Sequence, residues 1–361
     1  MIYWRPIPMT DPARPAQALA LAGGWCWFDR IEVLERGMPA RIIPASDAPA
    51  DVIARLIAPR AMLAGLALDR PRIMGILNVT PDSFSDGGRF LDPARALDQG
   101  RKMAEDADLL DIGGESTRPG APAVSVQQEI ARTAPVIAAL REAGLALPIS
   151  IDTRKADVAE AAMAAGAQVV NDVSGLVYDP ALAGLVARHD VPVCVMHARG
   201  TPETMQAEAD YDDVLLDVYD GLADCVARAV AAGIARDRIL VDPGIGFAKT
   251  GVHNLALIAR LSLFHGMGCP ILLGASRKRF IGTYGGAEAP DQRMPGSVAV
   301  ALAGVAQGAQ VVRVHDVAET RQALRVWLSL RTAGADRMPS QKPDEFSQGE
   351  TKSPLGSAGG L

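Results

Sequence analysis

The sequence lacks the features that mark secreted, membrane-bound or nucleic-acid-binding proteins. Its four cysteines are scattered and form no CxxC pair, so neither a disulfide framework nor a zinc site is indicated. No apolar run reaches the roughly 18 residues of a membrane-spanning helix, and the first residues do not follow the pattern of a signal peptide. A net charge of −6 and a pI near 5.5 provide no basic surface. We therefore expect a cytoplasmic protein that binds no nucleic acid and no membrane.

Several catalytic motifs are also missing. The segment GFAKT around Lys249 has Ala248 where a phosphate-binding P-loop needs glycine. No HExxH, Gly-x-Ser-x-Gly or convincing GxGxxG is present, which argues against zinc hydrolysis, a hydrolase nucleophile elbow and dinucleotide binding. With 361 residues, 49% of them hydrophobic, the chain is still long enough to bury a large core.

From Arg72 onward, short apolar runs alternate with longer alanine-rich stretches of helical spacing. This pattern is typical of βα units around a parallel sheet. Roughly eight runs read as strands, which is the number that a closed (β/α)8 TIM barrel needs. The predicted strands are Ile73–Leu77, Asp108–Ile112, Leu147–Ile151, Gln168–Val173, Val191–Met196, Ile239–Val241, Ile271–Gly274 and Val311–Val314.

The helices between these runs carry start and stop signals. In the helix after the third run, Thr153 is predicted to cap the N-terminus and Gly166 to end it. The segment Gly296–Gly308 consists mostly of alanine, valine and glycine. It is therefore predicted to pack closely against a neighbouring helix or, less simply, against a second subunit.

The chain divides into three parts. Residues 1–71 form an N-terminal extension of unknown role, in which Ala50–Leu68 is predicted to be one helix. The extension is either a packing segment or a device that covers the bottom of the barrel or adjusts dimer contacts. Residues 72–332 form the barrel, and the polar tail 333–361 is predicted to be disordered.

Polar residues stand at or just after the carboxyl end of almost every predicted strand. On a barrel these ends meet at one rim, where such folds keep their active sites. Taken singly, Asp152 reads as a helix cap, Asp242 as a turn residue and His197 as a structural histidine. Their repeated placement favours a site. The residues concerned are Asn78, Asp111, Asp152, Asn171, Asp172, His197, Asp242, Lys278, Arg313 and His315.

Two features predict an anion site that is shielded from water. Arg313 and His315 are two residues apart in VVRVHD, so strand alternation turns both side chains to one side. Arginine suits phosphate, and a nearby phosphate favours a protonated histidine. The loops 78–88 and 113–120 contain glycine, proline and several hydroxyl residues, with Arg118 in the second, and as lids they would exclude water from a reactive intermediate.

From about Arg72 to Leu330 the sequence resembles the dihydropteroate synthases, a pterin-binding family of folate biosynthesis. The resemblance rests on blocks in family order: ILNVTPDSFSDGG, DIGGESTRPG, SIDTRKADVAEAA, VVNDVSG, VCVMHARGTPETMQ, ILVDPGIGFAKT, GASRKRFIG and VRVHDVAET. It implies a Mg²⁺-assisted condensation of (7,8-dihydropterin-6-yl)methyl diphosphate with 4-aminobenzoate, which releases pyrophosphate. It also implies a homodimer.

The resemblance assigns roles to residues. Asn78 is the implied Mg²⁺ ligand. Arg118, Arg313 and His315 are implied to hold the diphosphate, and Thr117 to be a further contact to that substrate. The implied pterin pocket consists of Asp152, Asn171, Asp242 and Lys278, with Asp111 and Met196 as further substrate-binding candidates. Phe84, Phe247 and Ser276 are implied at the aminobenzoate site. Arg118, Lys278, Arg313 and His315 are the catalytic candidates.

Three other interpretations compete with the synthase. A methyltetrahydrofolate-dependent methyltransferase uses a similar pterin-binding barrel but has no diphosphate to hold, so the STRPG, SRK and RVHD blocks argue against it. A non-catalytic pterin-binding paralogue would tend to lose the loop residues that are retained here. A barrel with an unrelated substrate leaves the matching blocks unexplained. One departure is Arg279, which replaces a serine of some relatives directly after the pocket lysine.

Overall fold

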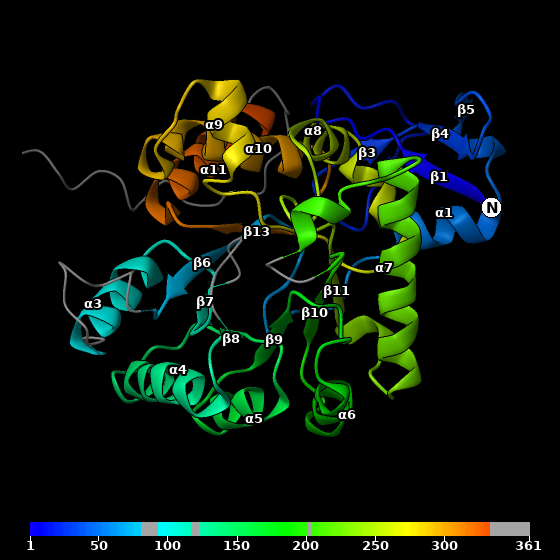
Figure 1. The fold of residues 1–361 in the computed structure, drawn as a ribbon. Helices are drawn as coiled ribbons and strands as arrows, with labels where there is room; N and C mark the ends of the chain where they lie inside the picture. The colour runs from blue at the N-terminus through cyan, green and yellow to red at the C-terminus, as the bar shows by residue number, and fades with distance from the viewer. Residues whose placement is uncertain (81–92, 117–122, 201–203, 333–361) are drawn as a thin grey trace, which may run out of the picture.

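The computed structural model describes residues 1–80, 93–116, 123–200 and 204–332, and at its centre is a parallel barrel (Figure 1). Its strands are β6 (Arg72–Asn78), β7 (Leu109–Gly113), β8 (Ile149–Asp152), β9 (Val169–Asp172), β10 (Val193–Met196), β11 (Ile239–Asp242), β12 (Leu272–Leu273) and β13 (Val311–Val314). They pair in the order β11-β10-β9-β8-β7-β6-β13-β12. The bridge between Val241 and Ile271 then closes the ring. The predicted (β/α)8 TIM barrel is therefore confirmed.

Each predicted run corresponds to one strand of the barrel. The runs are rich in valine, isoleucine and leucine because a parallel strand is buried on both faces. The burial strings agree, since all five residues of β7 and all four of β9, β10 and β11 are buried. β12 is shorter than predicted, because Ile271 pairs only through the bridge that closes the ring.

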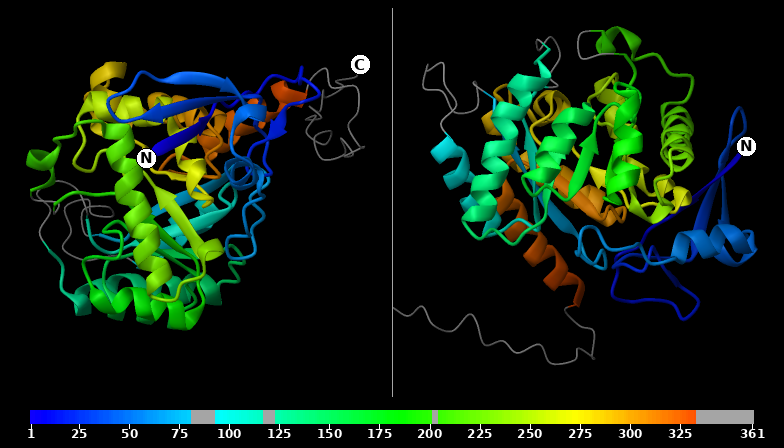
Figure 2. Two further views of the ribbon diagram at one scale, coloured as in Figure 1. Left: turned by 90° about the vertical axis from the view of Figure 1, so that its right-hand side faces the viewer. Right: turned by 90° about the horizontal axis from the view of Figure 1, so that it is seen from below.

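Helices surround the strands on the outside of the barrel (Figures 1 and 2). The helices between or after strands are α3 (Pro93–Ala104), α4 (Val126–Glu142), α5 (Ala156–Ala164), α6 (Pro180–His189), α7 (Val214–Ala231), α8 (Gly251–Ala259), α9 (Arg279–Gly285), α10 (Met294–Ala306) and α11 (Val317–Thr332). Short 3-10 helices are η2 (Met205–Glu208), η3 (Arg236–Arg238), η4 (Leu261–Met267) and η5 (Pro290–Arg293). Their buried faces and the outer faces of the strands form the main hydrophobic core.

The structure confirms the predicted C-terminal end of α5 but not its predicted N-terminal cap. Gly166 follows the helix with φ +115°, a left-handed conformation that suits glycine, and so ends it as predicted. Thr153 does not cap the helix, because the residue before its first turn is Lys155. The Thr153 hydroxyl instead accepts from the Lys155 N–H at 3.3 Å and donates to Glu129 at 2.7 Å.

The small residues of α10 permit close packing inside the subunit, as the composition predicts. A Cβ on Gly296 would lie 2.4 Å from Ile281 of α9. A Cβ on Gly304 would lie 2.2 Å from Leu273 of β12. Both glycines are therefore required by neighbours in the same chain.

The extension forms a small antiparallel unit on one flank of the barrel, beside α7 (Figure 2). It consists of β1 (Ile2–Pro6), β2 (Leu19–Ala20), β3 (Trp27–Phe28), β4 (Arg30–Glu35), β5 (Arg41–Pro44), η1 (Ala45–Asp47) and α1 (Ala50–Ile57). The Tyr3 hydroxyl donates to Asp220 of α7 at 2.8 Å, and Arg36 pairs with the same carboxylate at 2.7 Å. The extension has a hydrophobic cluster of its own around Phe28 and Leu56.

The prediction of one helix over Ala50–Leu68 is wrong. α1 ends at Ile57, because Ala58 precedes Pro59 and a residue before proline is driven out of the helical region. The chain then crosses the amino-terminal end of the barrel in a tight turn. There Leu63 and Leu68, 1% and 3% exposed, pack against the lowest inward-facing side chains of the strands. This part of the extension covers the bottom of the barrel.

Within the described ranges, no helix combines the length and the apolar character needed to cross a bilayer. The predicted disordered tail, 333–361, lies outside the described residues. The boundary between extension and barrel at residue 71 stays a prediction.

Substitution of Leu63 tests whether the stability of the barrel depends on the apolar side chains that cover its bottom. Leu63→Ala leaves a cavity beneath the strands, and we expect the free energy of unfolding to fall by about 2–5 kcal/mol. Urea denaturation followed by circular dichroism measures the loss. The control is Met62→Ala, since Met62 is 57% exposed and should change stability by no more than about 0.5 kcal/mol. Similar losses of unfolding free energy in the two variants would contradict a stabilising role for Leu63 at the bottom of the barrel.

Candidate active site at the carboxyl end of the barrel

Inward-facing residues of the strands form two stacked layers, because every second side chain of a barrel strand points inside. The lower layer is apolar and consists of Met74, Leu109, Val169, Cys194, Leu240, Leu272 and Val311. Two residues further along four of these strands come Asp111, Asn171, Asp242 and Arg313, so the next layer is largely polar, with the apolar Ile76 and Met196 beside them. These four predicted strand-end residues therefore meet inside one rim.

Arg313 joins the carboxylates of two other strands. Its Nε donates to Asp111 Oδ2 at 2.5 Å, and its Nη2 donates to Asp152 Oδ2 at 2.7 Å. The Asn171 amide N–H also donates to Asp111 Oδ2, at 3.0 Å. Among the described residues, Asp111 Oδ1 is buried with no hydrogen-bond partner. The cluster thus retains acceptors, and two of the five guanidinium N–H groups are used in these contacts.

Burial shifts the titration of these groups. It raises the pKa of Asp152 to about 7, with Arg313 opposing the rise and Asp111 adding to it. Burial also raises the pKa of Asp242 to about 6, against the opposing Gly244 N–H and the Lys278 charge. For Arg313, burial lowers the pKa, but Asp111 and Asp152 outweigh burial and hold it above its ordinary range. Perturbed carboxyls gathered in one place are a mark of functional sites.

Asp242, Phe247 and Lys278 lie near one another. Asp242 is 6% exposed, and its Oδ1 accepts from the Gly244 N–H at 2.7 Å. The Lys278 ammonium lies 4.2 Å from the centre of the Phe247 ring. A Cβ on Gly246 would come within 3.1 Å of the Lys278 side chain, so the lysine stem packs directly over this glycine.

His315 is held by a residue that was predicted to bind substrate. The Ser276 hydroxyl oxygen lies 3.2 Å from the His315 backbone N–H, which donates to it, and 3.1 Å from His315 Nδ1. Burial, followed by the charges of Arg313 and Arg277, lowers the pKa of His315 to about 3. The imidazole is therefore neutral at pH 7, and its protonation beside a phosphate stays a prediction.

Two ion-pair groups behind the rim were not anticipated from the sequence. Arg277 has φ +57°, and its guanidinium pairs with Asp316 at 2.5 Å, which ties the turn after β12 to the turn after β13. The second group is centred on Glu129, a fully buried carboxylate on α4. Charged helix residues usually face solvent, so the sequence offers no signal for the burial of Glu129. Arg277 and Asp316 lie on two turns 39 positions apart, and strand or helix periodicity does not predict that they pair.

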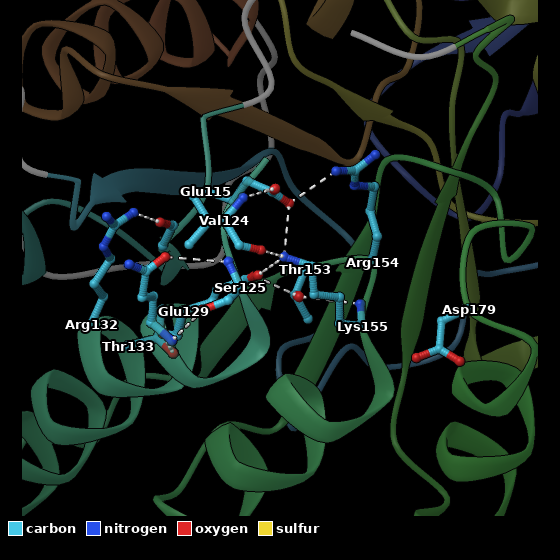
Figure 3. A network of polar contacts seen from close by, with 12 residues as sticks. Glu115, Val124, Ser125, Glu129, Arg132, Thr133, Thr153, Arg154, Lys155 and Asp179 are labelled. Atoms are coloured by element: carbon cyan, nitrogen blue, oxygen red, sulfur yellow. Dashed lines mark hydrogen bonds and ion pairs between the residues drawn. The ribbon is translucent and has the colours of Figure 1, made fainter. Parts of the chain in front are cut away.

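Figure 3 shows the groups that compensate the negative charge of the buried Glu129 carboxylate. Its Oε2 lies 2.6 Å from Lys155 Nζ, and its Oε1 accepts from the Thr153 hydroxyl at 2.7 Å. Lys155 also lies 3.4 Å from Glu115, which pairs with Arg154 at 3.0 Å. Because Thr153, Arg154 and Lys155 directly follow Asp152, this network fixes the turn that continues from β8.

Asn78 ends β6 half-buried and pairs in register with Gly113. A Cβ on Gly113 would lie 3.7 Å from Asn78 Oδ1 and 3.7 Å from Asp152 Oδ2, so the amide oxygen faces the same space as the carboxylate. In the described part of the chain, no three His, Cys, Asp or Glu side chains gather as a metal site. Mg²⁺ is commonly held by one or two protein oxygens together with substrate phosphates and water. The donors at Asn78 fit that arrangement.

The remaining predicted residues have different outcomes. Met196 is 3% exposed and pairs in register with Asp242. Asp172 accepts hydrogen bonds from the turn 174–176 and so has a structural role. Arg279 is exposed on the first turn of α9. Three predicted residues lie outside the described ranges: Phe84, Thr117 and Arg118.

Comparison with known proteins identifies a family with this arrangement. The model of a family described as "Pterin binding enzyme" matches residues 74–315. A dihydropteroate synthase of Synechocystis sp. is 45% identical over 258 residues, which is 71% of this chain and 89% of the relative. A dihydropteroate synthase of Neisseria meningitidis serogroup B is 48% identical over 271 residues, 73% of this chain and 94% of the relative.

Solved structures agree. A dihydropteroate synthase of Xanthomonas albilineans with 4-aminobenzoic acid is 49% identical, with a TM-score of 0.70 over 74% of this chain and 96% of the other. A structure of the Xanthomonas albilineans enzyme in complex with 7,8-dihydropteroate is 46% identical, with a TM-score of 0.67 over 74% of this chain and 95% of the other. The similarity leaves about a quarter of the chain uncovered.

Lys155→Met tests the network behind β8. The change leaves the Glu129 carboxylate buried without its cation, so we expect the free energy of unfolding to fall by about 3–5 kcal/mol. Urea denaturation measures the effect, and adding Glu129→Met should restore part of the loss. The control is Lys102→Met, because the Lys102 side chain is 68% exposed and pairs only on the surface. If Lys155→Met were as mild as this control, the network would not be structural.

Proposed function

Because the chain belongs to the pterin-binding enzyme family, and within it to the dihydropteroate synthases, we propose that its rim condenses (7,8-dihydropterin-6-yl)methyl diphosphate with 4-aminobenzoate. The products are 7,8-dihydropteroate and pyrophosphate, and the reaction belongs to tetrahydrofolate biosynthesis. The observation that carries the proposal is the polar layer formed by the buried Asp111, Asn171 and Asp242 and the half-buried Arg313, with Asp152 at its edge.

This layer suits the pterin ring. The 2-amino-4-oxo edge of a pterin carries neighbouring N–H donors, which a buried carboxylate accepts in pairs. Asp152 and Asp242 are such carboxylates, and the Asn171 carbonyl is available as an acceptor because its N–H group donates to Asp111. Lys278 would donate to acceptors of the ring. Each hydrogen bond to a charged group contributes about 1.5–3 kcal/mol, so rings without the donor edge are rejected.

Arg313 and His315 make up the described part of the anion site. Arg313 has donors beyond those that hold Asp111 and Asp152, and strand alternation turns His315 toward the same interior. Arg118 and Thr117 complete the site in the family pattern. We assign the diphosphate to this side of the rim, next to Asn78.

Asn78 would hold Mg²⁺ through its amide oxygen. When bound, the metal supplies positive charge that neutralises part of the negative charge of the diphosphate and so favours its departure. The fit rests on an oxygen donor that faces the space beside Asp152, with substrate phosphates and water as the other ligands.

The aminobenzoate site lies on the side of Phe247. Its ring, beside the Lys278 ammonium, offers an apolar wall for the benzene ring, and Phe84 would be a second wall. Ser276 lies near the aminobenzoate carboxylate in this assignment, although its described contact is with His315. Met196 contributes to the buried floor of the pocket.

In the reaction, the bond between the pterin methylene carbon and the diphosphate oxygen breaks, and the electron pair leaves with pyrophosphate. The positive charge that remains is delocalised into the pterin ring. The amino nitrogen of 4-aminobenzoate then forms the new bond to the methylene carbon and loses a proton. The protein supplies orientation, cationic groups for the leaving diphosphate and exclusion of water, without a covalent nucleophile.

We further infer a cytoplasmic homodimer. The four cysteines are all free and buried, which fits a reducing compartment. On α11, Val326 and Leu330 are 57% and 68% exposed. An apolar surface of this kind supports a contact between two copies of the chain.

Turnover tests the proposed function directly. Protein incubated with the pterin diphosphate, 4-aminobenzoate and Mg²⁺ should release dihydropteroate and pyrophosphate in equal amounts, and chelation of the metal should stop both. Asp152→Ala should raise KM for the pterin substrate roughly 10- to 100-fold. Arg313→Ala should lower kcat/KM roughly 100-fold or more, since it also leaves two buried carboxylates without their cation.

Lys102→Ala, on the exposed face of α3, should behave as the wild type. Binding of the pterin without release of pyrophosphate would overturn the synthase and favour a non-catalytic binding protein. Transfer of a methyl group from methyltetrahydrofolate would identify the alternative enzyme.

Pterin binding should strengthen as pH rises from 5 to 8. A protonated carboxyl cannot accept a pair of N–H donors, and the pKa values of Asp242 and Asp152 lie at about 6 and about 7. Ionisation through this window therefore adds acceptors, and calorimetric titration with 7,8-dihydropteroate should show the affinity rising in two overlapping steps. Asp242→Asn should remove the lower step. Affinity that is constant or falls over this range would contradict the role of these carboxyls.

A further inference from the structure

Lys249 lies beside the site, at the end of the turn that joins β11 to α8. The residue is 3% exposed. Its ammonium nitrogen lies 2.9 Å from the Phe247 carbonyl oxygen, 3.0 Å from His197 Nδ1 and 3.4 Å from the His197 carbonyl oxygen. Burial lowers the pKa of Lys249 to about 7, with the charge of Asp242 opposing the fall. The protonated form has three N–H donors, and these contacts accommodate all of them. The side chain thus links the turn to the end of β10.

His197 is a rigid partner for this link. Its backbone N–H donates to the Asp242 carbonyl at 3.0 Å. Its ring packs on Gly221 of α7, where a Cβ would lie 2.6 Å from the ring carbon Cδ2. Burial, followed by the charge of Lys249, lowers the pKa of His197 to about 3. The ring is therefore neutral at pH 7, and its Nδ1 can accept a hydrogen bond from the protonated form of Lys249.

The turn itself has an unfavourable backbone. Gly244 has φ +69°, and a Cβ there would lie 2.0 Å from the His197 carbonyl oxygen. Ala248 has φ +50°, a region that residues with a Cβ disfavour. The Gly246 N–H donates to Asn254 at 2.8 Å. A turn of this shape needs such contacts to persist, and Lys249 supplies the one that reaches across to β10.

We propose that Lys249 is a positioning residue of the dihydropteroate synthase reaction, which holds Phe247 beside Lys278 so that 4-aminobenzoate meets a preformed wall. The inference rests on the proposed function, because it uses Phe247 as that wall. The Phe247 carbonyl is bound by Lys249, and the ring of the same residue lies 4.2 Å from the Lys278 ammonium. Displacement of this one residue therefore alters the aminobenzoate side of the pocket.

Most of the pterin side is supported by elements outside this turn. Asp242 is the last residue of β11 and pairs in register with Met196, and the contact that the turn makes with its carboxylate comes from the Gly244 N–H, at the end of the turn away from Lys249. Asp152 and Asn171 lie on β8 and β9, which do not carry the turn. Loss of Lys249 should therefore affect the two substrates unequally. If Lys249 had a purely structural role, its loss would lower the free energy of unfolding and leave both KM values unchanged.

The test is Lys249→Met, which keeps the length of the side chain and removes the ammonium. Initial rates are measured with each substrate varied at saturating levels of the other. We expect KM for 4-aminobenzoate to rise roughly tenfold, the effect of one lost hydrogen bond to a charged group. KM for the pterin diphosphate should change much less. Equal changes in both KM values, or none, would overturn the inference.

A double-mutant cycle with Phe247→Ala shows whether Lys249 acts through Phe247. If it does, Lys249→Met should raise KM for 4-aminobenzoate in the wild type and add little in the Phe247→Ala background. Fully additive effects would show that Lys249 acts by another route and would overturn the proposal.

Arg60→Met is the matched control. Arg60 is 9% exposed and donates to the carbonyls of Arg55, Ala58 and His265, away from the rim. Its loss should lower the melting temperature and leave both KM values unchanged. If Lys249→Met does not fold, Lys249→Gln keeps amide donors and is subjected to the same kinetics, with a smaller rise in the same KM expected. Wild-type protein that forms no dihydropteroate would refute the proposed function, whereas active wild type with unaltered Lys249 variants would refute only this inference.

Discussion

The guanidinium of Arg313 lies between the carboxylates of Asp111 and Asp152, and the organisation of the rim depends on this arrangement. The charges come from β13, β7 and β8, so the ion pairs also tie these strands together at their carboxyl ends. Removal of Arg313 leaves both carboxylates without their cation in the interior of the barrel, which is far more costly than loss of a surface pair. The same groups retain acceptors and donors for a ligand, so stability and recognition depend on one set of atoms.

The apolar layer beneath these charged groups excludes water and so strengthens their electrostatic interactions. Leu63 and Leu68 seal the lower end of the barrel, and the inward-facing side chains above them contain few polar atoms. Water is thus kept from the underside of the polar layer, which is why burial raises the pKa of Asp152 and of Asp242. In such surroundings a hydrogen bond to a charged group is stronger than in water. The stability lost by burying carboxylates is offset by the large core around the barrel.

Much of this arrangement could be predicted from the sequence, because strand periodicity alone determines which residues share the rim. The positions of Asp152 and Arg313 follow from alternation along short apolar runs. Their pairing could not be predicted, since the two residues are 161 positions apart and alternation does not specify rotamers. The proposed helix over Ala50–Leu68 failed because one proline outweighed helical spacing. The sequence around Lys249 indicates only that it is not part of a P-loop, and its contact with His197, 52 positions away, depends on the tertiary structure.

A reaction that proceeds by positioning and electrostatics makes particular demands on the turns after the strands. No single residue does the chemistry, so the rate depends on how well groups from different strands keep their relative places. The structure meets this demand with pairs that link neighbouring turns, such as Arg277 with Asp316 and Lys249 with His197. Each pair lies behind a substrate-facing residue. Lys249 and His197 are buried, whereas the Arg277 side chain is 33% exposed. Substitutions in these turns should therefore alter substrate affinities selectively, even where the substituted side chain never touches a substrate.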